Sequence, residues 1–225
     1  MQPKATGISP ISEYEIHSPS RLARKLYLYP LYSGYYKYGP GYFITRTSYD
    51  SFLLMYLTKG ACEIETDGQH FEAEAGQLVL LDCYRPHRYG SRDSWEASWL
   101  HFDGPTARAY DQEITARHGR ILTPSSGVLG LLDEIRSSLR PPCTAGEAVL
   151  SAQLIRLLDL LLAGEEAEGE ESQKNAVADS IAYINEHFRE PVSLELLAAK
   201  AGISPFHFLR VFSQATGLTP HQYLL

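Results

Sequence analysis

The chain has 225 residues and a formal net charge of −7, and 44% of its residues are hydrophobic and 21% charged. This length allows one or two domains, and the hydrophobic fraction is enough for a packed core. No window approaches the ~20 apolar residues of a membrane span, and residues 1–20 lack the apolar run of a signal peptide. Three cysteines without a C-x-x-C spacing, Cys62, Cys83 and Cys143, indicate neither a disulfide framework nor a zinc site, so we expect reduced thiols in the cytoplasm.

Residues 27–102 have the pattern of an antiparallel β domain. Seven tyrosines lie between Tyr27 and Tyr42, either as a carbohydrate-stacking surface or as a packed N-terminal arm with its turns. Apolar, β-branched and aromatic runs follow in residues 52–65, 69–82 and 94–102, and turn sequences occur at 38–41, 67–68, 74–76 and 88–91. Short strands at this spacing are typical of a barrel or a sandwich, and a closed barrel would leave a central pocket.

The last of these runs has two chemically different faces. Because successive side chains of a strand point to opposite sides, Trp95, Trp99 and His101 share one face, and Leu100 and Phe102 share the other. Indole rings stack on the C–H faces of sugars, so the first face suits a ligand pocket. A tryptophan on a barrel strand is also frequently part of the core, and both interpretations stay open at this point.

Two helices are expected after residue 123. The first has an apolar stripe in residues 128–139, and Thr144 and Glu147 have the spacing of a capping box at the start of the second. The second, residues 147–162, is apolar over more surface than one partner helix covers. We expect four of its leucines to form an antiparallel two-helix seam in a homodimer, with ordinary core as the alternative: Leu150, Leu154, Leu157 and Leu161.

Negative charge is concentrated in residues 164–176, where five glutamates contribute five of the acidic charges. This composition is typical of a solvated linker. The net charge of the chain therefore does not exclude a nucleic-acid partner for the residues that follow.

Residues 193–214 fit two short helices joined by a tight turn. Ser193 is a suitable N-cap for the first helix, and Ala198 stands where a second helix would cross closely. Gly202 can supply the positive φ of the turn, and Ser204 and Pro205 can begin the second helix. Small residue, glycine and β-branched apolar residue in this order indicate a helix-turn-helix.

The second helix has a core face and an outward face. Phe208, Val211, Phe212 and Ala215 form the stripe that should face the core. The outward residues, which we expect to contact DNA, are Phe206, Leu209, Arg210 and Ser213. Arg210 can donate two hydrogen bonds to a guanine edge, although a surface arginine on a hairpin without a ligand is the alternative, because the segment is not basic.

The sequence from Ser204 onward resembles the signature of the AraC/XylS family of bacterial transcription regulators, a recognition helix S-P-x-x-F-x-R-x-F followed by T-G-x-[ST]-P-x-x-Y-L. The matching residues are Ser204, Pro205, Phe208, Arg210, Phe212, Thr216, Gly217, Thr219, Pro220, Tyr223 and Leu224. The resemblance implies that Phe206, Leu209 and Arg210 face the groove of double-stranded DNA. The family carries two such hairpins, of which we expect this chain, ending at Leu225, to hold the first alone.

Residues 40–103 resemble, more loosely, the cupin-like β-barrel that senses effectors in the same family. The residues that recur in the family's order are Gly60, Gly76, Pro86, His87 and Trp99. The fold class we expect is α+β: an N-terminal cupin-like antiparallel β-barrel with a helical pair for effector sensing and dimerisation (1–163), an acidic linker (164–176) and an all-α first helix-turn-helix (177–225).

The resemblance further implies that Arg46, Tyr89 and Trp99 line the effector pocket, while His87 is either part of it or a structural histidine. Aromatic rings and an arginine fork suit hydroxyl groups or a carboxylate, so a sugar or a related small molecule is the expected effector. The complete set expected at the effector is Arg46, His87, Tyr89, Trp95, Trp99 and His101. We therefore expect an effector-responsive, sequence-specific DNA-binding regulator acting as a homodimer, a function that also allows RNA polymerase as a partner.

A cupin-type metal-dependent enzyme or a carbohydrate-binding module is the alternative. Metal-binding cupins hold their ion with an H-x-H pair, a glutamate and a further histidine. Residues 62–70 contain no H-x-H, and His70, His87 and His101 are isolated from one another in sequence. We therefore expect no catalytic residue, metal ligand or cofactor.

Overall fold

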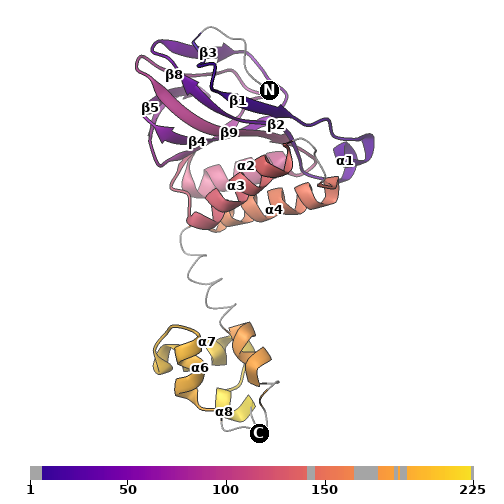
Figure 1. The fold of residues 1–225 in the computed structure, drawn as a ribbon, viewed down its shortest axis with the longest axis vertical. Coiled ribbons are helices and arrows are strands. Elements are labelled where there is room, and N and C mark those ends of the chain that lie inside the picture. Colours follow the sequence, from indigo (N-terminus) through magenta and orange to yellow (C-terminus); the bar gives the residue numbers. More distant parts are fainter. Residues whose placement is uncertain (1–6, 141–144, 165–176, 185–186, 188–191, 224–225) are drawn as a thin grey trace. The chain divides into compact units, whose positions relative to one another are not determined.

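The computed structural model describes residues 7–140, 145–164, 177–184, 187 and 192–223 (Figure 1). Its contacts divide the chain into two compact units, Met1–Ala163 and Gly164–Leu225. The expected linker residues 165–176, together with Cys143 and Thr144, lie outside the described part. None of the helices within the described ranges is both long and apolar enough to cross a membrane.

Unit 1 contains two antiparallel sheets, as expected for a cupin-like barrel. The larger has the order β1 (Glu13–Ile16), β2 (Tyr29–Tyr38), β9 (Trp95–Asp103), β4 (Phe52–Lys59), β7 (Leu78–Asp82) and β10 (Ile121–Leu122). The smaller has the order β3 (Tyr42–Arg46), β8 (His87–Ser91), β5 (Ala61–Thr66) and β6 (Gln69–Glu74). The tyrosine-rich segment is thus mostly strand β2.

The larger sheet is buried on both faces, which explains the nearly continuous apolar sequence of β4 and β7. Its inner residues, such as Leu53, Met55 and Trp99, form one core with Ile64 and Tyr89 of the smaller sheet. Its outer residues form a second core with the helices: Phe52, Leu54, Leu78, Leu80, Leu100 and Phe102. The predicted alternation along β9 is therefore confirmed.

The described part of unit 1 contains four helices: α1 (Arg21–Leu26), α2 (Ala107–His118), α3 (Ser126–Ser138) and α4 (Glu147–Ala163). The sequence did not predict helix α2, which is additional to the expected pair. Only Ala107, Asp111 and Ile114 of its twelve residues are buried, too few for an apolar stripe. Figure 1 shows α2, α3 and α4 along the larger sheet. Glu147 at the start of α4 accepts hydrogen bonds from the backbone N–H and the hydroxyl of Ser20, the N-cap of α1, at 2.6 and 2.7 Å.

The leucines expected at a dimer seam instead belong to the core of unit 1. Leu150, Leu154 and Leu157 are 0% exposed and Leu161 is 5% exposed within a single chain. They pack against the outer face of the larger sheet and against α2 and α3. Side chains that are already buried cannot form an intermolecular seam without opening this core, so ordinary core, the alternative interpretation, is correct.

Unit 2 contains helical residues 177–184 and helices α6 (Leu194–Lys200), α7 (Pro205–Thr216) and α8 (Pro220–Tyr223). The predicted caps are confirmed: the hydroxyl of Ser193 accepts from the N–H of Leu196, and that of Ser204 accepts from the N–H of His207. Gly202 has a φ of +67°. The buried core is Val177, Ile184, Leu197, Ala198, Phe208, Val211 and Phe212.

The burial of α4 predicts a large loss of stability when its leucines are shortened. Leu154→Ala should reduce the free energy of unfolding by about 2–5 kcal/mol, since it leaves a cavity between α4 and the sheet. The control is Val149→Ala on the same helix, where the side chain is 54% exposed and the change should stay within about 0.5 kcal/mol. Denaturant titration of both variants measures the difference, and equal midpoints would contradict the assignment.

Candidate functional site

Three polar residues lie side by side at one end of the smaller sheet. Arg46 of β3 is directly opposite His87 of β8, and His87 is directly opposite Thr66 of β5. The next inward-facing row contains Tyr89 and Ile64, which belong to the core between the sheets. Directly opposed residues share a face, so Arg46, His87 and Thr66 also face the interior. They line a cavity of about 470 Å³.

Arg46 has a positive charge that no carboxylate balances within the described ranges. Its guanidinium lies over the ring of Tyr49, 4.4 Å from the centroid. The acidic residues that line the same cavity are already paired: Glu65 lies 2.9 Å from Arg88, and Asp67 lies 2.8 Å from Arg85 and 3.2 Å from Arg120. Arg46 is therefore the lining cation whose charge has no carboxylate partner among the described residues.

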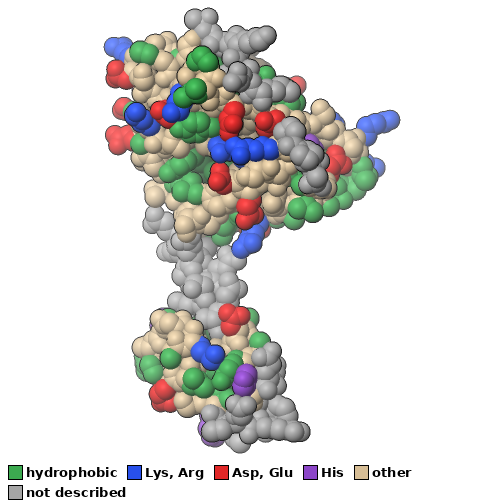
Figure 2. Space-filling model, in the orientation of Figure 1, with side chains coloured by type: hydrophobic (Ala, Val, Ile, Leu, Met, Phe, Trp, Pro, Cys, Tyr) green, Lys and Arg blue, Asp and Glu red, His purple; other side chains and the backbone are tan. Residues whose placement is uncertain are grey.

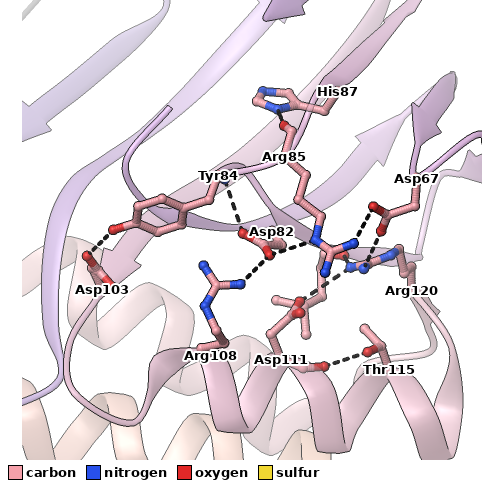
Figure 3. Close-up of polar contacts among 11 residues, drawn as sticks. Asp67, Asp82, Tyr84, Arg85, His87, Asp103, Arg108, Asp111, Thr115 and Arg120 are labelled. Atoms are coloured by element: carbon pink, nitrogen blue, oxygen red, sulfur yellow. Dashed lines mark hydrogen bonds and ion pairs between the residues drawn. The ribbon is translucent and has the colours of Figure 1, made fainter. Parts of the chain in front are cut away.

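His87 presents a hydrogen-bond acceptor to the interior. Its Nδ1 lies 2.8 Å from the backbone oxygen of Arg85 (Figure 3), and because a carbonyl only accepts, Nδ1 carries the proton. Burial, followed by the nearby charge of Arg46, lowers the pKa of His87, so the ring is neutral at pH 7. Its buried Nε2 is a bare lone pair without a partner in the described structure, and the buried Oγ1 of Thr66 also lacks one.

Deeper in the barrel, aromatic rings surround His101. The rings of Trp99, Tyr49 and Tyr32 lie 5.7, 5.2 and 6.1 Å from the imidazole centroid. The Oγ of Ser51 lies 2.8 Å from its Nδ1. Burial lowers the pKa of His101 to about 3, with smaller effects from Arg46 and His87, so the ring is neutral at physiological pH.

Tyr89 is close to His87 and Trp99 is close to His101, whereas Trp95 is distant from both histidines. The ring of Tyr89 is nearly parallel to that of His87, at 6.2 Å and 8°. Trp95 stacks on Tyr38 at 3.9 Å and 14°, fully buried, beside a different cavity of about 380 Å³. Six residues of strand separate it from His101, a distance of about 20 Å. Trp95 therefore shares a face with Trp99 and His101 but not a pocket, because alternation does not measure distance along the strand.

Thr66, Tyr49 and Ser51 were missing from the residues expected at the site. Thr66 belongs to the site because it is paired with His87 in the sheet. Tyr49 and Ser51 lie in the segment between β3 and β4. Pairing between distant strands brings these side chains together, and no local periodicity indicates it. The one available signal was the concentration of hydroxyl groups in residues 45–51.

An ion-pair network joins the rim of this cavity to helix α2 (Figure 3). Asp67, in the turn between β5 and β6 at a φ of +52°, binds Arg120, which also lies 3.3 Å from the buried Asp111 of α2. Asp82 at the end of β7 accepts from Arg108 of α2 at 2.6 Å. Burial raises the pKa of Asp111, and the charge of Arg120 opposes this shift. The turn at the rim is therefore held to α2.

Helix α2 is held in turn to α4. The hydroxyl of Tyr110 donates to Asp159 at 2.7 Å, and the Nε2 of His118 lies 2.9 Å from the backbone oxygen of Leu162. A continuous set of polar contacts thus extends from the cavity rim to the last turn of α4.

Metal-ligating groups do not cluster in the part of the chain that the structure describes: it contains no set of three His, Cys, Asp or Glu side chains placed to hold an ion. Cys62 and Cys83 are buried thiols, and burial raises the pKa of each to about 12. Both are therefore protonated at neutral pH and unsuited to act as nucleophiles.

Helix α7 is the element of unit 2 that could enter a DNA groove. Phe206 is 81% exposed, Arg210 is exposed, and Leu209 and Ser213 are partly exposed. Ala215 was expected in the core and is exposed. The other described basic residue of the hairpin, Lys200, lies 4.2 Å from the centroid of the Tyr183 ring.

The two units together define a class of protein: a barrel with a polar cavity at one end, joined in one chain to a helix-turn-helix. Family models match both parts, the AraC-like ligand binding domain over residues 30–180 and the AraC family of bacterial regulatory helix-turn-helix proteins over residues 184–225. The chain belongs to the AraC family of helix-turn-helix transcription regulators and carries its ligand-binding domain.

Two curated relatives support this membership. The MmsAB operon regulatory protein of Pseudomonas aeruginosa is 28% identical over 212 residues, which are 88% of this chain and 66% of that protein. The HTH-type transcriptional activator RhaS of Salmonella schwarzengrund is 32% identical over 97 residues, which are 43% of this chain and 34% of RhaS. The chain thus matches less than two thirds of the length of either relative.

Solved structures give weaker likenesses. ToxT from Vibrio cholerae is 11% identical, with a TM-score of 0.37 over 88% of this chain and 98% of ToxT. A cupin superfamily protein from Desulfitobacterium hafniense is 10% identical, with a TM-score of 0.32 over 40% of this chain and 75% of that chain.

The exposure of Arg210 on α7 generates a prediction about DNA. In a protein that also carries a second hairpin, Arg210→Ala should weaken binding to a specific operator by ~1–3 kcal/mol, because it removes a hydrogen-bonding fork from the outward face. Fluorescence anisotropy at one fixed salt concentration measures this loss. The control is Arg117→Ala on α2, which removes the same charge from unit 1, and equal affinities of the two variants would exclude a base-reading role.

Proposed function

We propose that the protein is a cytoplasmic, effector-responsive transcription regulator that binds a sugar or a related small molecule in the barrel and DNA through α7. The observation that carries the proposal is the polar row at the end of the smaller sheet. Arg46, the Nε2 of His87 and the Oγ1 of Thr66 face one cavity. The Nε2 and the Oγ1 are buried without a hydrogen-bond partner in the described structure, and Arg46 contacts the ring of Tyr49 but has no carboxylate partner there. Buried polar atoms are normally hydrogen-bonded, so unpaired ones in a cavity favour a ligand.

The aromatic residues below this row suit the apolar faces of a sugar ring. Trp99 is 8% exposed, and its Nε1 is buried without a partner in the described structure. An indole that stacks on C–H groups while offering one N–H donor is a common element of carbohydrate recognition. Tyr49 and Tyr32 extend the aromatic wall around His101. In this proposal, Arg46, His87, Tyr89, Trp99 and His101 contact or position the effector.

For DNA, we propose that Phe206, Leu209, Arg210 and Ser213 face the major groove. The described part of this hairpin offers few cations, so a single copy should bind DNA weakly, since phosphate neutralisation supplies most nonspecific affinity. Two copies in a homodimer would add their contacts. RNA polymerase is the further partner we propose for such a regulator.

The effector proposal predicts a ligand-dependent rise in melting temperature. A screen of mono- and oligosaccharides and their derivatives should contain a compound that stabilises the protein, because binding to the native state alone raises its stability. Arg46→Ala should remove this shift, whereas Arg117→Ala, which removes an exposed arginine from α2, should retain it. A folded Arg46→Ala variant that responds fully would contradict the site.

The dimer proposal requires a surface other than the buried leucines of α4. The exposed apolar side chains on and beside this helix are Leu22 (58%) and Leu26 (57%) of α1 and Val149 (54%) and Ile155 (41%) of α4. Leu22, Leu26 and Val149 lie at or near the start of α4. The bond between Ser20 and Glu147 holds α1 to the start of α4, and Figure 2 shows hydrophobic side chains gathered in this region. We propose this surface, the α1–α4 patch, as the contact with a second copy.

Substituting Leu22 and Leu26 together with Glu should convert the dimer into a folded monomer, because the two carboxylates would be buried without partners in the pair but remain hydrated in the monomer. Light scattering reports the mass, and circular dichroism reports folding. Ile11→Glu, at a 67% exposed position outside the α1–α4 patch, is the control. A monomeric parent protein at micromolar concentration, or a double variant that remains dimeric, would rule out the patch.

A further inference from the structure

We propose that the effector is a hydroxylated carboxylic acid, such as a sugar acid, and not a neutral sugar. This inference rests on the proposed barrel site and concerns the chemistry of its ligand. The carboxylate would lie on the guanidinium of Arg46, and a hydroxyl group would donate to the Nε2 of His87. Both assignments follow from the charges and protons that the cavity already contains.

The charge of the cavity supports an anion. Four charged residues line it, and Glu65 and Arg88 form a pair at 2.9 Å. Asp67 is bound by two arginines from outside this lining, Arg85 and Arg120. Of the four, Arg46 alone lacks a carboxylate partner among the described residues, and its guanidinium lies 4.4 Å from the centroid of the Tyr49 ring.

A neutral sugar would accept hydrogen bonds from Arg46 but would leave its charge unbalanced in a partly enclosed site. A carboxylate matches the guanidinium fork in both geometry and charge. A phosphate monoester is less suitable, since it carries about −1.5 to −2 at pH 7 and would place surplus negative charge beside Glu65 and Asp67.

The protonation of His87 supports a hydroxyl group. Its Nδ1 donates to the backbone oxygen of Arg85, so its buried Nε2 can only accept (Figure 3). A carboxylate has no proton to donate and cannot satisfy this atom. A hydroxyl group can donate to Nε2, and the hydroxyl of Thr66, opposite His87, can complete the interaction.

The register of the strands places the two side chains next to each other. Arg46 and His87 are directly opposed on neighbouring strands, which lie about 4.8 Å apart. One small ligand that carries both a carboxylate and a hydroxyl can therefore reach both side chains. The cavity volume of about 470 Å³ lies within the range of small-molecule sites and admits a six-carbon acid.

Matched pairs of ligands test the charge requirement. We would titrate glucose against gluconate and galactose against galacturonate, as sodium salts at equal ionic strength, and follow melting temperature and calorimetric heat. At least one acid should bind at millimolar concentration and its neutral partner should not. Arg46→Gln should weaken binding of the acid by roughly 10- to 100-fold, since it removes charge-assisted hydrogen bonds, while Arg46→Lys should lose less. Arg117→Gln serves as the control for net charge.

A second comparison tests the hydroxyl requirement. The probes are butyrate and 3-hydroxybutyrate, and the hydroxylated acid should bind more tightly to the parent protein. Thr66→Val, which has nearly the same shape but no hydroxyl group, should reduce this difference without unfolding the barrel.

The outcomes distinguish the inference from the proposed function. Binding of a neutral sugar with the affinity of its acid, unchanged in Arg46→Gln, would overturn the acid assignment and leave the barrel as an effector site. Failure of every sugar and acid to bind would count against both. Equal binding of butyrate and 3-hydroxybutyrate would overturn the hydroxyl assignment.

Discussion

The burial of the larger sheet on both faces is the constraint on which unit 1 depends. Leu54 and Leu100 fill the outer side against the helices, while Leu53 and Trp99 fill the inner side against the smaller sheet. Neither side can be opened without exposing a core, so this sheet is the rigid part of the unit. The smaller sheet contributes its inner face to the core, and polar residues such as Arg46 enter the interior at its end, where the apolar core stops.

The sequence predicted the features that depend on residues close together in the chain. Two-residue alternation assigned the faces of β9, and the N-caps Ser193 and Ser204 were readable because a cap and its helix are neighbours in sequence. The apolar stripe of α4 was also readable, but its partner was not. The width of an apolar stripe indicates how much of the helix surface must be covered, but not by what. Helix α2 covers part of α4, and it has too few buried residues to be predicted from the sequence.

The candidate site was predicted in part. Arg46, His87, Trp99 and His101 were expected, yet the sequence alone could not separate them from Trp95, which shares their face at the other end of a long strand. Nor could it include Thr66, because that residue meets His87 only through the register of β5 and β8. Sequence separation hides such contacts, whereas antiparallel pairing specifies them residue by residue.

The ion pairs at the rim provide a route by which a ligand in the barrel would change the contacts of the helices. In the proposed bound state, a negative charge on Arg46 would repel Asp67 and attract Arg85 and Arg120, the two cations that Asp67 now holds. Arg120 also binds Asp111, so a change in its pairing alters how α2 is held to the rim. Contacts of α2 with Asp159 and Leu162 extend this effect to α4, the last described helix before unit 2 in the chain. A ligand can shift an arrangement only by as much as its affinities for the two arrangements differ, and a charge added beside a bridging arginine provides such a difference.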